Sequence, residues 1–287
     1  MIDYPFYVND FDRVKDHKIL NPEVGKIFEQ PQAFWYGEKN GKGGCSTVNK
    51  SLYRFLHRAD PYWPVLVCYN MPDRDMGHYS KGGAKTNDNY LEFVESFAKC
   101  IGGRELFLIF EPDAIPHSTL MSRNGRNKRL QLMKSALETI TSNCKARVYV
   151  DVGHSNWLSP EDVGNLFNRV TNEKIRGFSV NVSNFRTTKE SMAWSLRVSE
   201  YVDNKHFVID TSRNGRGPYG NDWCNPPDRS LGTPPTTNTG EDLCDAFLWI
   251  KIPGESDGKC NGGPRAGRFW PEYAVDLVKN TEWINAD

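Results

Sequence analysis

A pair of acidic residues at the end of an apolar run is the first feature of this sequence that suggests chemistry. Leu106–Phe110 is an unbroken apolar segment, and Glu111, Pro112 and Asp113 follow it directly. Continuous apolar residues without helical spacing are typical of a strand buried on both faces, as in a parallel sheet. The proline ends the strand and favours an extended Glu111, so Asp113 should stand at the mouth of the sheet or barrel. An acid there is placed for chemistry.

The alternative role for Asp113 is a helix N-cap. Aspartate is a favoured N-cap residue, and the segment from Ala114 onward could be helical. For a lone aspartate after a strand, capping is the commoner role. The other strand ends therefore have to decide between the two interpretations.

Polar or ionisable groups follow six consecutive predicted strands. These ends read YNMPDRD (69–75), EPD (111–113), DVGH (151–154), NVSN (181–184), DTSR (210–213) and KIPGESD (251–257). In a βα barrel the active site is built at the carboxyl ends of the strands, so six such ends favour one carboxylate-rich cleft. Trp35, Trp157 and Trp223 lie in the same set of loops. Flat aromatic faces beside carboxylates and amides suit a sugar chain, although core packing is the commoner role of any single tryptophan.

Alternating strand-like and helix-like segments must position these groups. Strands are expected at 33–36, 65–69, 106–110, 148–150, 178–182, 207–209 and 246–250, and helices at 47–58, 90–100, 128–143, 160–170, 191–202 and 272–279. Seven strands, each followed by a crossover, imply an α/β fold with parallel strands. The simplest such architecture is a single barrel domain spanning residues 1–287, with no internal linker.

The composition is that of a charge-balanced globular chain of 287 residues, one large domain or two ordinary ones. Thirty-six Lys and Arg residues match 36 Asp and Glu residues, so neither nucleic acid nor an anionic membrane is an expected partner. No segment approaches the roughly 20 apolar residues of a membrane span. The start, MIDYPFYVND, lacks the features of a signal peptide, so either the protein is cytosolic or a leader lies outside this sequence.

The seven cysteines form no CxxC pair and no Cys/His cluster, so no zinc or other metal site is expected. The odd number leaves at least one free thiol. Cys68 and Cys244 lie beside apolar segments, where a small buried core residue is expected. Cys224 and Cys260 lie in Gly- and Pro-rich surroundings, where a disulfide that staples loops is expected.

Eight motifs in a fixed order resemble glycoside hydrolase family 6, the cellulases. They are VLVCYNMPDRD, IFEPD, YVDVGHSNW, NVSNF, IDTSRNG, DWCNPP, TTNTG and FLWIKIPGESDG, and the match runs from PFYVN near the start to the last predicted helix. The resemblance implies a distorted seven-stranded parallel β/α barrel, similar to a TIM barrel. It also implies hydrolysis of β-1,4-glucan with inversion at the anomeric carbon, without a metal or an organic cofactor.

The resemblance also implies roles for four residues of this chain. Asp113 corresponds to the general acid, Asp75 to the carboxylate that assists it and helps to organise the water, and Asp257 to the debated base. Tyr69 corresponds to the tyrosine beneath the distorted sugar. An inverting enzyme needs its acid and base roughly 6.5–9.5 Å apart with room for water, and a like charge such as Asp75 raises the pKa of the acid.

A further set of residues is expected to contact the substrate. By their motifs these are Asp151, His154, Trp157, Asn184, Trp223, Lys251 and Glu255, together with Trp35 and Ser80 from the same loops. For His154 a hydrogen-bonding role in the core is the alternative.

The sequence departs from the family pattern at three places. Met76 and Met121 replace a cysteine pair that the family usually bridges, which leaves Cys224–Cys260 as the expected disulfide. Lys81 stands where the family commonly has a serine that holds the water, and Ser80 is the expected substitute. The loop after Asp257, KCNGGPRAG, is too short to roof the cleft into the tunnel of a cellobiohydrolase.

These observations together predict an extracellular, monomeric, inverting endo-β-1,4-glucanase with an open cleft. The segment between Asp75 and Asn89, with Gly77, Gly82 and Gly83, is the one that could still close over the substrate. The alternatives are a cellobiohydrolase of the same family and a carbohydrate-binding protein in which the altered water loop impairs hydrolysis.

Overall fold

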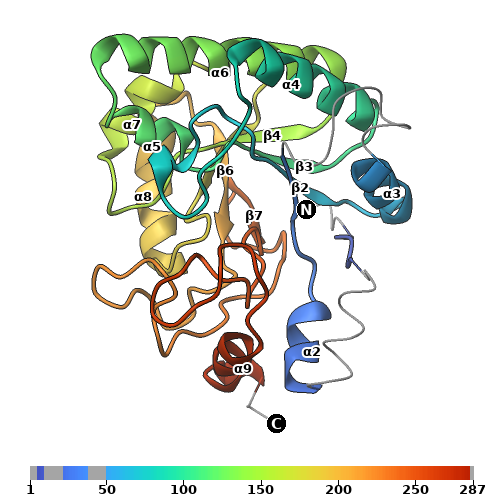
Figure 1. The fold of residues 1–287 in the computed structure, drawn as a ribbon, viewed down its shortest axis with the longest axis vertical. Helices are drawn as coiled ribbons and strands as arrows, with labels where there is room; N and C mark the ends of the chain where they lie inside the picture. Colours follow the sequence, from blue (N-terminus) through green and yellow to red (C-terminus); the bar gives the residue numbers. More distant parts are fainter. Residues whose placement is uncertain (1–4, 10–21, 38–49, 285–287) are drawn as a thin grey trace.

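Seven parallel strands form one curled sheet in the computed structural model, which describes residues 5–9, 22–37 and 50–284 (Figure 1). The strands are β1 (Phe34–Tyr36), β2 (Val65–Cys68), β3 (Phe107–Phe110), β4 (Arg147–Asp151), β5 (Gly177–Val180), β6 (His206–Asp210) and β7 (Cys244–Leu248). Each strand pairs with the next one along the chain, so all connections are crossovers in one direction. The parallel α/β fold predicted from the sequence is confirmed.

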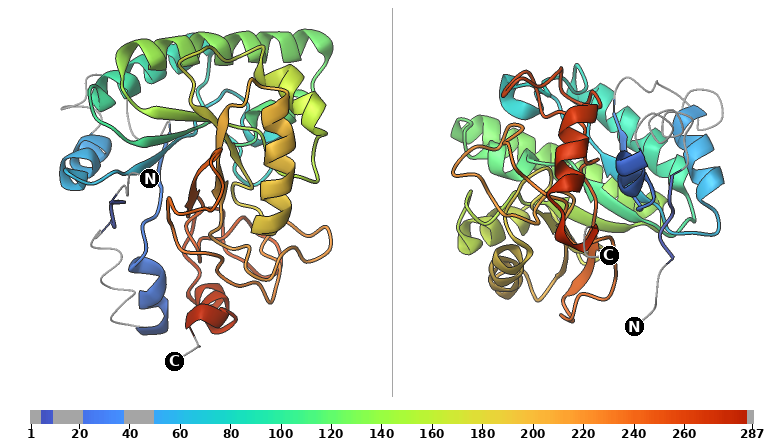
Figure 2. Two further views of the ribbon diagram at one scale, coloured as in Figure 1. Left: turned by 180° about the vertical axis from the view of Figure 1, so that it is seen from behind. Right: turned by 90° about the horizontal axis from the view of Figure 1, so that it is seen from below.

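Helices connect most of the strands and cover the outer surface of the sheet. They are α2 (Pro22–Phe28), α3 (Lys50–Ala59), α4 (Asn87–Ile101), α5 (Ala114–Ser118), α6 (Arg123–Asn143), α7 (Pro160–Phe167), α8 (Thr188–Glu200) and α9 (Pro271–Lys279), with short 3-10 turns η2 (Asp75–Gly77) and η3 (Glu282–Ile284). Hydroxyl groups of Thr86, Ser122, Ser159 and Thr187 cap α4, α6, α7 and α8 by accepting a backbone N–H three residues on. Helices α4 and α6 lie across one side of the sheet in both views (Figures 1 and 2).

The sheet is a curled half-barrel, which confirms the distorted seven-stranded barrel predicted from the sequence. In the described part of the chain, β1 pairs with β2 alone, and β7 with β6 alone. Two hydrogen bonds link the edges: Ala33 N–H donates to the carbonyl of Trp249 at 3.0 Å, and Trp35 Nε1 donates to that of Ile250 at 2.8 Å. The connection from β6 to β7 is also not a helix. Residues 211–243 run there as turns and loops, at the lower end of the molecule in Figure 1.

The strands bury side chains on both faces, as their continuous apolar sequences predict. Inward residues such as Val67, Ile109 and Leu248 fill the barrel, while Leu66, Cys68 and their equivalents pack under the helices. Cys68 and Cys244 are buried free thiols, which confirms the core role expected of them.

A separate apolar cluster closes the lower end of the molecule. Trp249 turns outward after β7 and packs with residues of α2 and α9, which lie together at this end (Figure 2). In the described residues no helix combines the length and apolar character that a bilayer crossing requires.

Candidate active site

Asp113 occupies a helix cap position without acting as a cap. Helix α5 begins at Ala114, and Asp113 directly precedes it in the left-handed conformation at φ 67°, but its side chain makes no capping hydrogen bond. The carboxyl group is therefore available for another purpose. The sequence left open whether Asp113 caps a helix or serves in chemistry. Its backbone occupies the cap position, but its side chain does not cap the helix.

Glu111 is not extended, contrary to the expectation from the following proline. Its φ is 49°, because its buried carboxylate turns back to the end of β2. There it accepts the backbone N–H groups of Asn70 at 3.0 Å and Met71 at 2.9 Å, and the hydroxyl of Tyr90 at 3.0 Å. These bonds offset a backbone conformation that costs of order 1–3 kcal/mol in non-glycine residues.

Asp151 and Asp210 also accept backbone N–H groups from neighbouring loops. Asp151, at the end of β4, has no exposed surface and accepts the backbone N–H of Asp113 at 2.8 Å and the hydroxyl of Ser179 at 2.9 Å. Asp210, at the end of β6, is equally buried and accepts the backbone N–H groups of Ser183 and Lys251. The carboxylate of Asp151 thus holds the backbone of Asp113, and the substrate contact predicted for Asp151 stays a prediction.

The surroundings of Asp113 favour its protonated form. Burial raises its pKa well above the usual range, and the neighbouring Asp151 and Asp75 carboxylates raise it further. Burial likewise raises the pKa of Asp151 to about 7. Burial also raises the pKa of Asp75, although the N–H of Ser80 works in the opposite direction. These three carboxyl groups therefore bind protons more tightly than isolated carboxyl groups do.

Arg74 fixes the loop that carries Asp75. Its guanidinium donates to the carbonyl of Tyr69 at 2.6 Å and to that of Ser80 at 3.0 Å, and it lies 4.6 Å from the centre of the Tyr69 ring. The N–H of Ser80 then donates to Asp75 Oδ2 at 2.6 Å. Lys81 is exposed, so Ser80 takes the place beside Asp75. The PDRD motif by itself did not predict this role for its arginine.

Asp257 is the most strongly paired acid of the set. Arg213 Nη1 donates to its Oδ2 at 2.9 Å, Lys251 Nζ lies 3.3 Å from Oδ1, and the N–H of Asn225 donates to Oδ2 at 3.0 Å. Burial alone would raise the pKa of Asp257, but the two cations hold it below the usual range. Arg213 is fully buried and was also missed, although it stands at a strand end in IDTSRNG.

Two of the predicted tryptophans, Trp35 and Trp157, pack against different aromatic rings. Trp35 packs edge-on against Tyr69 with ring centres 5.3 Å apart. Trp157 lies between His154 at 5.4 Å and His117 at 5.1 Å, and burial lowers the pKa of each histidine to about 4. Both histidines are thus neutral near pH 7. No sequence signal distinguished His117.

The remaining predicted contacts occupy loops around the same end of the barrel. Trp223 is 46% exposed, in keeping with a surface on which a sugar could stack. Asn184 accepts the N–H of Phe185 through its side chain. Glu255 is partly exposed in the loop before Asp257.

A disulfide ties down the loop beyond Asp257. Cys224 and Cys260 are bonded, with Cα atoms 6.2 Å apart, as the resemblance implied. Between them Asn225 exchanges hydrogen bonds with Asp257, accepting its N–H at 2.7 Å. The loop of Asp257, the candidate base, is thus held by the disulfide and by Asn225.

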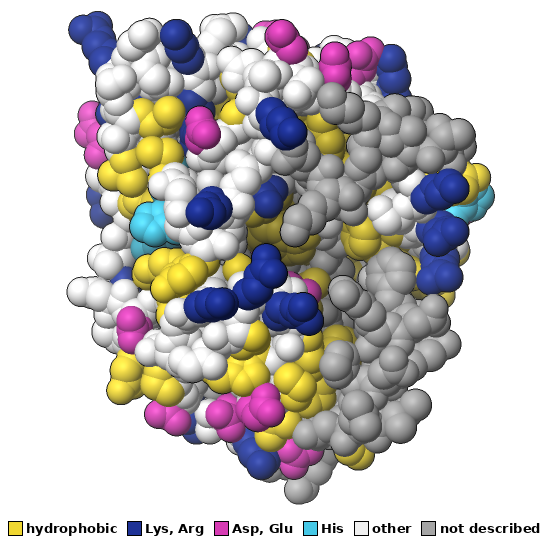
Figure 3. Space-filling view, in the orientation of Figure 1, with side chains coloured by type: hydrophobic (Ala, Val, Ile, Leu, Met, Phe, Trp, Pro, Cys, Tyr) yellow, Lys and Arg dark blue, Asp and Glu magenta, His cyan; other side chains and the backbone are white. Residues whose placement is uncertain are grey.

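The face of the molecule in Figure 3 shows Lys and Arg side chains gathered near its centre, between hydrophobic patches and with little acidic surface. In the described residues no group of three or more His, Cys, Asp or Glu side chains is arranged to hold a metal ion.

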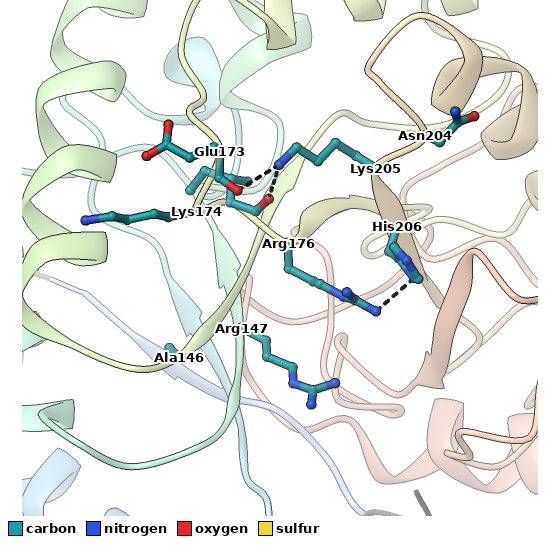
Figure 4. Close-up of a pocket in the computed structure, with 9 residues that line it drawn as sticks. Ala146, Arg147, Glu173, Lys174, Arg176, Asn204, Lys205 and His206 are labelled. Atoms are coloured by element: carbon teal, nitrogen blue, oxygen red, sulfur yellow. Dashed lines mark hydrogen bonds between the residues drawn. The ribbon is translucent and has the colours of Figure 1, made fainter. Parts of the chain in front are cut away.

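A hollow of about 380 Å³ lies at the opposite ends of the strands (Figure 4). Its lining is basic, but the charges are used internally. Arg176 makes two hydrogen bonds to Asp245, and Lys205 donates to the carbonyl of Ile175 at 2.7 Å. Groups at this face of a βα barrel serve stability more often than chemistry.

Comparisons with known proteins agree with the geometry. The family model described as "Glycosyl hydrolases family 6" matches residues 9–281. Endoglucanase A of Cellulomonas fimi is 41% identical over 261 residues, covering 90% of this chain and 56% of that protein. Endoglucanase 1 of Streptomyces sp. (strain KSM-9) is 39% identical, covering 88% of this chain and 70% of that protein.

A solved structure extends the comparison to three dimensions. The endoglucanase Cel6 from Mycobacterium tuberculosis, in complex with methyl-cellobiosyl-4-deoxy-4-thio-β-D-cellobioside, superposes with a TM-score of 0.91 at 39% identity and covers 98% of each chain. The cellobiohydrolase Cel6A from Chaetomium thermophilum, at 22% identity and a TM-score of 0.79, shares the fold.

Proposed function

Because this chain belongs to glycosyl hydrolase family 6, we propose that it is an inverting endo-β-1,4-glucanase that cleaves internal bonds of cellulose or related glucans. We assign residues 1–287 to one catalytic domain that acts outside the cell as a monomer. The cellulase relatives, the thio-oligosaccharide bound by the M. tuberculosis enzyme and the Cys224–Cys260 disulfide support this proposal.

The observation that carries the proposal is the state of Asp113. Its side chain is not used in capping and stands at a strand end, where burial and neighbouring carboxylates raise its pKa well above the usual range. A general acid needs a proton at the working pH and a position beside the leaving oxygen. Asp113 meets the first requirement through its surroundings, and its backbone is held in place by Asp151.

We propose that the attacking water is bound beside Asp75. The Asp75 carboxylate is held by the N–H of Ser80, and its raised pKa gives it a greater affinity for a proton than Asp257 has. Asp257 stays ionised between Arg213 and Lys251, which makes it a weak base but a permanent negative charge. Such a charge stabilises the oxocarbenium-like transition state. Tyr69, with burial and three carboxylates raising its pKa, remains a neutral phenol beneath the sugar.

The rival function is that of a carbohydrate-binding protein that has lost hydrolysis. Turnover of carboxymethylcellulose, measured as reducing ends beside a binding isotherm on the same protein, separates the two. We expect turnover, with the α-anomer formed first when the products of cellohexaose are followed by NMR. Binding without turnover supports the rival, and a β-anomer formed first contradicts inversion.

A further inference from the structure

An exposed turn in the long connection between β6 and β7 carries two aromatic side chains. Residues 219–223 are all exposed, and Tyr219 and Trp223 at the two ends of this run are 48% and 46% exposed. The N–H of Asp222 donates to the carbonyl of Tyr219 at 3.0 Å and closes the turn. Gly220 has a φ of 57°, and a Cβ atom placed on it would meet nothing within 4 Å. The turn therefore faces open space at this point.

Arg229 supports the ring of Tyr219 from behind. Its guanidinium carbon lies over the ring, 5.3 Å from the ring centre, which is a cation–π contact. Arg229 is itself buried, and it donates to the carbonyl of Gly217 at 2.7 Å and to that of Pro227 at 2.9 Å. The bond to Gly217 also joins the two ends of the segment 217–229. The ring of Tyr219 thus rests on a fixed base, and its other face is open to solvent.

A hollow of about 390 Å³ lies against this turn, lined by Tyr219, Gly220, Asn221 and Asp222. A flat aromatic face beside an amide and a carboxylate suits one sugar unit, because the C–H face of the sugar can stack on the ring while its hydroxyl groups bond to the polar side chains. Trp223 packs toward a different neighbour, with its ring centre 6.2 Å from that of Tyr79. Tyr219 therefore offers a sugar contact apart from the one predicted for Trp223.

We propose that Tyr219 and its turn form an accessory glucan-binding site, which holds a sugar of the polymer outside the catalytic centre and so tightens binding to insoluble cellulose. This inference rests on the proposed function. Once the active site holds one segment of a polymer, a second contact forms at a high effective concentration and adds to the affinity. A short oligosaccharide that occupies the active site alone gains nothing from Tyr219.

Three variants separate the ring of Tyr219 from other effects. Tyr219→Ala deletes the ring, and Tyr219→Phe keeps the ring and removes only the hydroxyl group. Tyr62→Ala, which removes a tyrosine of 50% exposure between α3 and β2, is the matched control. All three changes replace exposed side chains, so the fold should persist, and circular dichroism checks this.

The first measurement is adsorption to phosphoric-acid-swollen cellulose, made in an Asp113→Asn background so that hydrolysis does not consume the polymer. Tyr219→Ala should raise the dissociation constant about 2- to 10-fold, the range of one aromatic contact. Tyr219→Phe and Tyr62→Ala should leave it nearly unchanged. An unchanged dissociation constant in Tyr219→Ala, or an equal increase in Tyr62→Ala, overturns the proposal.

The second measurement tests whether the site is separate from the catalytic centre. With Asp113 intact, Tyr219→Ala should leave kcat/KM on cellohexaose unchanged and lower the initial rate on dilute swollen cellulose by a similar factor. Equal losses on both substrates place Tyr219 in the active site and overturn the accessory site. Adsorption that depends on Tyr219 in a protein whose wild type shows no turnover supports the site and refutes the proposed function alone. Turnover with adsorption that does not depend on Tyr219 refutes the site alone.

Discussion

Replacing Asp151 by asparagine should make the acid of this site lose its proton at a lower pH. The carboxylate of Asp151 accepts the N–H groups of Asp113 and Gly153 through Oδ1, at 2.8 and 3.1 Å, and the Ser179 hydroxyl through Oδ2. An asparagine can accept both N–H groups with its carbonyl oxygen and donate to the serine oxygen. Asp151→Asn therefore removes the charge and keeps the geometry.

The sign and size of the effect follow from the neighbouring charge. After burial, Asp151 is the largest cause of the raised pKa of Asp113, so its removal lowers that pKa. A charge at this range shifts a neighbour by about 1–3 pKa units. Asp113 must be protonated to act, so activity is present below its pKa and is lost above it. The alkaline limb of the kcat/KM profile should therefore move to lower pH by at least about one unit.

The assay is kcat/KM on cellohexaose from pH 4 to 10, with Asp210→Asn as the control. Asp210 is another fully buried strand-end carboxylate that accepts backbone N–H groups, and it does not contact Asp113. Its replacement should leave the alkaline limb nearly in place. An alkaline limb that stays fixed or moves upward in Asp151→Asn, while circular dichroism shows intact folding, refutes the assignment of Asp113 as an acid tuned by Asp151.

Three other predictions concern the acid, the disulfide and the mode of attack. Asp113→Asn should reduce hydrolysis of cellohexaose by about 10²–10⁴-fold with little change in binding, and less for a substrate with a good leaving group; near-normal turnover removes Asp113 from the role. Reduction of Cys224–Cys260 should lower the free energy of unfolding by about 3–4 kcal/mol in denaturant titration, because the closed loop spans 36 residues. An unchanged unfolding midpoint contradicts this. Soluble glucan should lose viscosity much faster than it gains reducing ends, and early cellobiose with nearly constant viscosity contradicts endo action.

The strongest periodic patterns predicted the elements well, and the errors have physical causes. Helix α6 was expected from 128 and begins at Arg123, because its first turn is polar. The strand expected at 178–182 ends at Val180, since Val182 is buried beyond the strand and reads as part of it. Helix α2 was missed because seven residues hold too little of a helical period. The first residues of the helix expected at 47–58 lie outside the described part of the chain.

The candidate site was predicted as one set of acids, and the structure divides it into two. Asp75, Asp113 and Asp257 stand in loops that follow β2, β3 and β7, while Glu111 and Asp151 are fully buried and hold backbone N–H groups of the adjacent loops. Both kinds of carboxylate follow a buried strand. Local sequence therefore could not separate a carboxylate that faces substrate from one that fixes a loop.

The sequence by itself determined the parallel strands, the polar strand ends, the family resemblance and the place of Asp113 after a buried strand. These properties depend on patterns within a few residues, where periodicity and turn chemistry act. Only the tertiary structure decided that Arg213 pairs with Asp257, 44 residues away, and that Tyr79 rests on Gly258. Such contacts form between segments that the fold brings together, so the charge state of each acid depends on packing that no local pattern records.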